Sequence, residues 1–106
     1  MTEKQFQDAV VQYAHIFRWR VQHTRPARRK DGQWRTPIQG DAGFPDLVLV
    51  QSDGSDGPLF VELKSATGKI SRSQTLWLEA LRKAGAEVYL WRPADWEAIA
   101  ARLQRR

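Results

Sequence analysis

The sequence predicts a small α/β domain in which helices flank a mixed β-sheet. Apolar residues recur at helical spacing near both ends, β-forming runs lie between them, and Gly, Pro and Asp-Gly steps separate these segments. We expect the order helix, three strands, helix, strand, helix. A chain of 106 residues can bury one thin hydrophobic core, so we expect a single domain over residues 1–106.

The first helix is expected over residues 2–17. Its apolar positions recur at helical spacing from Phe6 to Phe17, and Thr2 with Gln5 forms a capping-box pattern at its start. The alternating segment WRVQH, residues 19–23, predicts a short strand.

A long loop is expected over residues 24–43, which contain two prolines and three glycines and show little periodicity. Such loops in compact domains are usually functional or disordered. This one carries most of a basic run together with an aromatic residue: Arg25, Arg28, Arg29, Lys30, Trp34 and Arg35.

A hairpin and a second helix follow. Strands are expected at about 45–51 and 58–65, and the turn signals in SDGSDG between them favour antiparallel pairing. Ser71 and Gln74 form a second capping box, and Gly85 ends that helix.

The last strand and helix complete the order. AEVYLW, residues 86–91, reads as a strand, and the final helix opens at Pro93 and Asp95.

Composition narrows the classes of function. Without cysteine there are no disulfides, thiolate metal sites or Cys nucleophiles, and no run is long enough to span a bilayer, so we expect a cytoplasmic protein. The net charge of +5 and the pI near 10.1 fit a polyanionic partner, although a modest positive excess also serves solubility.

Charged residues on the two hairpin strands are the main functional signal. Alternation puts Glu62 and Lys64 on one face of their strand, and the hairpin brings Asp46 beside Glu62. Ionised side chains inside a protein are costly unless they are paired or bound to a metal. Asp46, Glu62 and the backbone carbonyl of Leu63 are hard oxygen ligands for Mg²⁺, and Lys64 can orient or deprotonate a water that attacks a phosphodiester. The alternative is a turn aspartate and an exposed strand pair on the wet face of an antiparallel sheet.

These motifs resemble a known family. GFPDLVLV, FVELK, GKISRSQTLWLEALRKAGAEVYLWRP and an acidic residue on the first helix are similar to VRR-NUC, the virus-type replication-repair nucleases of the PD-(D/E)xK superfamily, over nearly the whole chain. The resemblance implies a restriction-endonuclease-like fold and a nuclease that depends on Mg²⁺, or on Mn²⁺ as a substitute. It also implies recognition of DNA by structure, as in resolvases of four-way (Holliday) junctions.

The resemblance assigns further residues. Asp46, Glu62 and Lys64 match the core motif, Glu3 matches an acidic position near the metal, and Gln74 matches a glutamine after the Glu-x-Lys strand. The insertion from about Arg28 to Asp41 departs from the family's usual short basic segment.

Several candidates have a second explanation. Glu3 suits the helix dipole, and Gln74 suits the cap of Ser71, although both also lie on inward-facing stripes and can reach the sheet. Gln7 and His23 are weaker candidates. The basic loop residues are either solvated or bind DNA, and Lys69 and Arg72 can contact phosphate at a helix N-terminus.

We therefore expect a structure-specific endonuclease that acts on branched DNA in a bacterial or phage-infected cell. Resolving a junction takes two coordinated cuts, which favours a homodimer. The alternatives are a flap or nicking endonuclease and a DNA-binding module that does not cleave.

Overall fold

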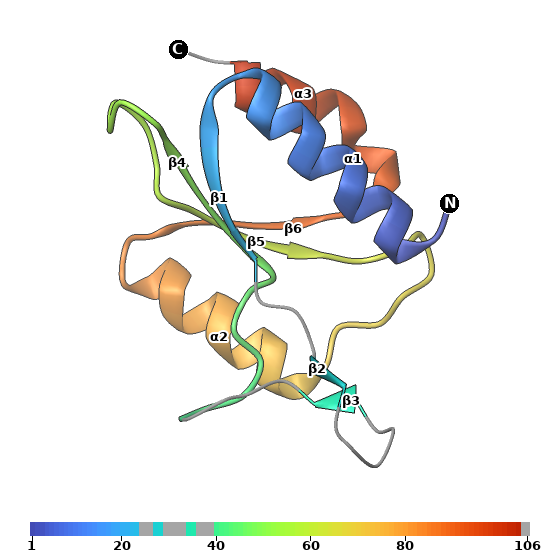
Figure 1. The fold of residues 1–106 in the computed structure, drawn as a ribbon. Helices are drawn as coiled ribbons and strands as arrows, with labels where there is room; N and C mark the ends of the chain where they lie inside the picture. The colour runs from blue at the N-terminus through green and yellow to red at the C-terminus, as the bar shows by residue number, and fades with distance from the viewer. Residues whose placement is uncertain (24–26, 29–33, 36–39, 105–106) are drawn as a thin grey trace.

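The computed structural model describes residues 1–23, 27–28, 34–35 and 40–104, and of residues 27–28 and 34–35 the backbone alone (Figure 1). It confirms the predicted α/β fold, a four-stranded mixed sheet flanked by three helices. The elements in order are α1 (Glu3–Ile16), β1 (Trp19–His23), β2 (Ala27–Arg28), β3 (Trp34–Arg35), β4 (Leu47–Gln51), β5 (Leu59–Leu63), α2 (Arg72–Lys83), β6 (Glu87–Trp91), the 3₁₀-helix η1 (Pro93–Asp95) and α3 (Trp96–Gln104).

The main sheet has the strand order β1-β4-β5-β6. β1 and β4 pair antiparallel, as do β4 and β5, whereas β5 and β6 pair parallel and are joined through α2. The register sets Leu47 opposite both His23 and Val61. The residues next to Leu47 and Val61, Asp46 and Glu62, are therefore neighbours at one end of the hairpin.

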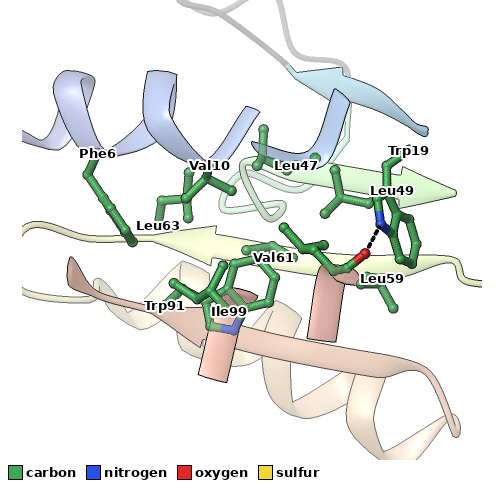
Figure 2. Packing of buried hydrophobic residues seen from close by; sticks show 12 residues of the cluster. Phe6, Val10, Trp19, Leu47, Leu49, Leu59, Val61, Leu63, Trp91 and Ile99 are labelled. Atoms are coloured by element: carbon green, nitrogen blue, oxygen red, sulfur yellow. Dashed lines mark hydrogen bonds between the residues drawn. The ribbon is translucent and has the colours of Figure 1, made fainter. Parts of the chain in front are cut away.

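The hydrophobic core lies on one face of this sheet. α1 and α3 cover that face, and α2 lies on the other (Figure 1). Leu59, Val61 and Leu63 of β5 alternate into the core, as do Leu47 and Leu49 of β4 (Figure 2). The remaining members of the core cluster are Phe6, Val10, Ala14, Trp19, Trp91, Ile99 and Leu103. Because Phe60 and Glu62 point away from this core, β5 presents a polar group toward the side of α2.

Helix starts follow the capping boxes in the sequence. Gln5 N donates to Thr2 Oγ1 at 3.1 Å, and Thr2 N donates to Gln5 Oε1 at 2.8 Å. Ser71 and Gln74 make the equivalent pair of bonds at the start of α2. Each pair satisfies two donors that the first helical turn would otherwise leave unbonded.

Some elements differ from the expectation. The segment predicted as a loop contains the two-residue strands β2 and β3, which pair antiparallel. β5 ends at Leu63, so Lys64 follows the strand although its backbone N–H still donates to the Trp91 carbonyl at 3.1 Å. No helix in the described part of the chain is long and apolar enough to cross a membrane.

A polar network joins three elements at the far end of the hairpin. Arg102 of α3 is buried and donates from both terminal nitrogens to the Asp56 carboxylate, at 2.8 Å each. Its Nε donates to Glu87 at 2.6 Å, and this contact lowers the pKa of the Glu87 carboxyl. The guanidinium also lies 5.4 Å from the ring centroid of Trp19, a cation–π contact. Arg102 thus connects α3 to β6 and to the β4–β5 turn.

We expect Arg102→Ala to reduce the free energy of unfolding by about 2–3 kcal/mol, because it leaves two neighbouring carboxylates without their cation. Thermal unfolding should show a drop in Tm of roughly 10 °C. Lys4→Ala is the control, since it removes an exposed pair with Asp8 (3.0 Å) that contributes less than about 0.5 kcal/mol. Equal effects of the two substitutions would contradict the role given to Arg102.

Candidate active site

Asp46, Glu62 and Lys64 meet where β4 begins and β5 ends. Asp46 directly precedes β4, and its Oδ2 accepts a hydrogen bond from the backbone N–H of Leu63 at 2.8 Å. Glu62 lies beside it on β5, and Lys64 Nζ is 3.7 Å from Glu62 Oε2. Strand alternation and hairpin register place the three side chains together.

Glu62 is the most buried of the three, with 1% of the residue exposed. Its Oε2 accepts a hydrogen bond from Gln74 Nε2 at 2.9 Å. Its other oxygen, Oε1, is buried and has no hydrogen-bond partner among the described residues. Leaving an acceptor in this state costs about 1–3 kcal/mol, so the site has an unfilled requirement for a donor or a cation.

The environment of Glu62 favours its neutral form. Burial, and then the nearby Asp46 carboxylate, raise the pKa of Glu62 from its ordinary 4.5 to about 8. Lys64 opposes this rise, and Glu3 adds to it. Two carboxylates close together in a buried place cannot both ionise without a compensating charge. A divalent cation would supply that charge.

The residues fit a hard divalent cation. Among the described residues no group of three or more His, Cys, Asp or Glu side chains is arranged to hold a metal. Asp46 and Glu62 instead bring two carboxylates together, and the carbonyl of Leu63 is the third oxygen that the sequence suggests. Mg²⁺ is commonly bound in this way, through one or two carboxylates while it keeps several waters.

The side chain of Gln74 both caps α2 and hydrogen-bonds Glu62. Its Oε1 accepts from Ser71 N at 2.9 Å in the helix cap, while its Nε2 donates to Glu62. The cap and the inward-facing role that the sequence offered as alternatives thus occur together. Capping fixes the rotamer of Gln74, and this holds its amide toward the carboxylate.

Gly43 controls how the loop before Asp46 docks on α2. Its φ is +98°, and a Cβ placed there would lie 2.5 Å from the backbone carbon of Ser73. Trp77 also holds this loop, because its Nε1 donates to the Asp41 carbonyl at 3.2 Å and its ring packs edge-on against Phe44. The loop that carries Asp46 and the helix that carries Gln74 are therefore in direct backbone contact.

Arg92 holds the loop that follows Lys64. One of its guanidinium nitrogens, Nη1, donates to the carbonyls of Ser65 and Gly68, at 2.7 Å each. The same loop leads into the cap of α2, and Arg92 itself precedes η1. Arg92 thus ties the Lys64 segment to the end of β6, the edge strand that pairs with β5.

Other predicted site residues are more dispersed. Glu3 is the first residue of α1, and its side chain is exposed. Its negative charge contributes to the raised pKa of Glu62. The Gln7 amide hydrogen-bonds Nε2 of His23, between α1 and the end of β1. Lys69 and Arg72 are exposed beside the start of α2.

Most of the predicted basic loop is outside the described residues. This applies to Arg25, Arg29 and Lys30, while Arg28 and Arg35 are described by their backbone alone, in β2 and β3.

Gly43 and Arg92 are the positions that reasoning from the sequence missed as parts of the site. The signal for Gly43 was its place in GFPD, three residues before the aspartate. Arg92 belongs to the WRP segment, but no sequence pattern predicts its hydrogen bonds to the loop after Lys64.

The site is of the kind found in metal-dependent hydrolases of phosphodiesters: paired carboxylates and a lysine at the ends of adjacent strands. The chain belongs to the VRR-NUC family, since the model of the VRR-NUC domain matches residues 8–95. VRR-NUC domains are nuclease domains of the PD-(D/E)xK kind, which generally use divalent metals.

A curated relative agrees with this assignment. Fanconi-associated nuclease 1 of Danio rerio is 46% identical over 46 residues, a stretch that covers 43% of this chain and 5% of that protein. The match thus involves only a small part of the relative's length. No solved structure matches the chain. The family match begins after Glu3, so it includes Asp46, Glu62 and Lys64 but not Glu3.

We expect Gly43→Ala to disturb the site, because the added Cβ collides with the backbone of Ser73 as well as straining a positive φ. The combined cost should be about 2–4 kcal/mol in the free energy of unfolding. Gly40→Ala is the matched control, as Gly40 has a φ of +109° but open space around its Cβ position, so it should cost only about 1 kcal/mol. Equal losses in chemical denaturation would show that the contact with α2 is unimportant.

A second prediction concerns pH. In EDTA the Glu62 carboxyl ionises near pH 8 when the chain is folded but near 4.5 when it is unfolded. The unfolded chain therefore releases this proton first, and the free energy of unfolding should fall as pH rises from about 4.5 to 8. We expect a decrease in Tm of at least about 5 °C over this range.

Glu62→Gln should remove this part of the pH dependence, since the amide does not titrate. Mg²⁺ should raise Tm more at pH 8 than at pH 6, because it binds the ionised carboxylates. Parallel Tm profiles of the wild type and Glu62→Gln in EDTA would contradict the shifted pKa.

Proposed function

We propose that this protein is a metal-dependent DNA endonuclease whose site consists of Asp46, Glu62 and Lys64, supported by Gln74. The observation that carries the proposal is the buried Glu62 carboxylate beside a second carboxylate and a lysine. One of its oxygens has no hydrogen-bond partner among the described residues. A structural ion pair would be expected to satisfy both oxygens of a buried carboxylate. An open carboxylate pair instead suits a cation that arrives with the substrate.

Asp46, Glu62 and the carbonyl of Leu63 would hold Mg²⁺, or Mn²⁺ in its place. The bound ion would supply Lewis-acid polarisation of the phosphate and neutralise developing charge. Gln74 keeps Glu62 in position through its amide. Glu3 adds negative potential that attracts the cation.

Lys64 is placed to act on the attacking water. Its side chain is 13% exposed, and its Nζ lies 3.7 Å from Glu62 Oε2. It orients the water whose oxygen forms the new bond to phosphorus as the P–O bond to the leaving sugar oxygen breaks. The attacking water gives up a proton to solvent, and the leaving oxygen takes up a proton from solvent. The positive charge of Lys64 also stabilises the negative charge that develops on the phosphate oxygens.

Positive residues near the site favour a nucleic-acid substrate. Lys69 and Arg72 are exposed at the start of α2, where backbone N–H groups also attract phosphate. The expected contacts of Arg25, Arg28, Arg29, Lys30 and Arg35 with the DNA backbone belong to this proposal.

Branched DNA is the substrate we propose, with the four-way junction as the leading example. The family resemblance supports it, and two coordinated cuts would need a homodimer. A flap or nicking endonuclease is the alternative within the same chemistry. The proposed setting is the cytoplasm of a bacterial or phage-infected cell.

We expect Lys64→Ala to lower the cleavage rate of a labelled four-way junction, flap or duplex by at least about 10³-fold, with little change in DNA affinity. The lysine acts in the transition state, whereas most binding energy comes from phosphate contacts elsewhere. Assays with Mg²⁺, Mn²⁺ and EDTA, at saturating protein, would measure this effect and identify the preferred substrate.

Lys83→Ala, a change at an exposed lysine in the last turn of α2, is the control and should cut like the wild type. Cleavage by Lys64→Ala at the wild-type rate would refute the role of Lys64. Tight DNA binding by the wild type without cutting in any metal would favour a module that only binds DNA.

A further inference from the structure

A concave site lies between α1 and β1. It is a cavity of about 340 Å³. The residues that line it are Gln7, Asp8, Val11, Gln12, His15, Val21 and His23. The α1 members share one helix face, and Val21 and His23 alternate onto one face of β1. The catalytic chemistry proposed above uses none of these side chains.

The lining suits an uncharged heterocycle. Amide and imidazole groups on its walls offer both donors and acceptors, and the half-buried Val11 and Val21 add apolar surface. Asp8, the charged side chain in the lining, is paired with Lys4 at 3.0 Å. Among the described residues that line the cavity there is no arginine or lysine, the usual partners of phosphate.

One end of the groove lies near the strand end that carries Asp46, but on the α1 face of the sheet. Glu62 points to the opposite face, toward α2. Gln7 lies one helical turn after Glu3, whose charge acts on Glu62. The Gln7 amide hydrogen-bonds the His23 ring. His23 pairs with Leu47 of β4, and Leu47 directly follows Asp46. From this pair the cavity extends along α1 toward His15, away from the carboxylates.

We propose that this groove binds one unpaired nucleobase of the DNA strand whose phosphate lies at Asp46 and Glu62. The amides of Gln7 and Gln12 hydrogen-bond the edge of the base, and the valines contact its face. This proposal rests on the proposed nuclease function, and it names the substrate feature that the site selects: a nucleotide already unpaired beside the cut. A base in continuous duplex must first leave its stack, which costs a few kcal/mol.

Binding of DNA that lacks single bases tests this groove. The substrate is a fluorescent flap or gapped duplex, and an abasic site is placed at each unpaired position in turn. Anisotropy titrations use protein with Lys64→Ala, so that cleavage does not interfere. We expect one abasic position to weaken binding about 10-fold, the effect of losing contacts of about 1–2 kcal/mol with one base.

Gln12→Trp should fill the groove. With this variant the intact DNA and the abasic DNA should bind with equal affinity, while fully paired duplex binds as before. Gln22→Trp is the matched control, because Gln22 is an exposed glutamine that alternates to the other face of β1, and it should keep the 10-fold difference. Gln12→Ala should reduce the difference if the bulky variant folds poorly.

Two results would overturn the groove proposal. One is equal binding of the intact DNA and all abasic DNAs, and the other is a 10-fold difference that persists in the filled variant. Both are read from binding alone. They are therefore distinct from a failure of the nuclease function, which would appear as absence of cleavage by the wild type in Mg²⁺ and Mn²⁺.

Discussion

The burial of the Glu62 carboxylate is the constraint on which the rest of the site depends. One oxygen is held by Gln74, and the other has no donor among the described residues. This arrangement costs stability, which the apolar core on the other face of β5 must offset. The strand thus has two roles. Leu59, Val61 and Leu63 pack the sheet against α1 and α3. Glu62, on the opposite face of the strand, points toward Gln74 and Lys64. Proteins commonly place such strained or unsatisfied groups at functional sites.

Backbone contacts keep the partners of Glu62 in register. Gly43 lets the loop before Asp46 rest against the first turn of α2, from which Gln74 reaches the carboxylate. Arg92 holds the loop between Lys64 and that same helix through two carbonyls. The site is therefore built by loops that rigid elements fix at both ends. Such support is what holds catalytic groups close to their productive geometry.

Local patterns were enough to predict most of the fold and that Asp46, Glu62 and Lys64 lie close together. Helical spacing and capping residues gave α1 and α2, and alternation on β5 with the hairpin turn brought Asp46, Glu62 and Lys64 together. These sequence signals involve residues that are close together in the chain, or the pairing of the two hairpin strands.

The contacts that could not be predicted join segments that are far apart in the sequence. The contact of Gly43 with Ser73 and the bonds of Arg92 arise only when loops dock, so no periodicity reveals them. The two-residue strands β2 and β3 are too short to produce an alternating pattern. Glu3 illustrates the intermediate case: its place on the helix was clear, but exposure and electrostatic influence on Glu62 required the folded arrangement.

The Arg102 network and the carboxylates of Asp46 and Glu62 occupy opposite ends of the β4–β5 hairpin. Arg102 binds Asp56 before β5 begins, whereas Glu62 lies near the end of the strand. The exposed residues 52–55 of the turn lie just outside that network. Extra residues or a chemical label inserted there would be separated from Asp46 and Glu62 by the length of the hairpin. This turn is therefore the natural position at which to lengthen the chain or attach a reporter without altering the end of the sheet that carries Asp46 and Glu62.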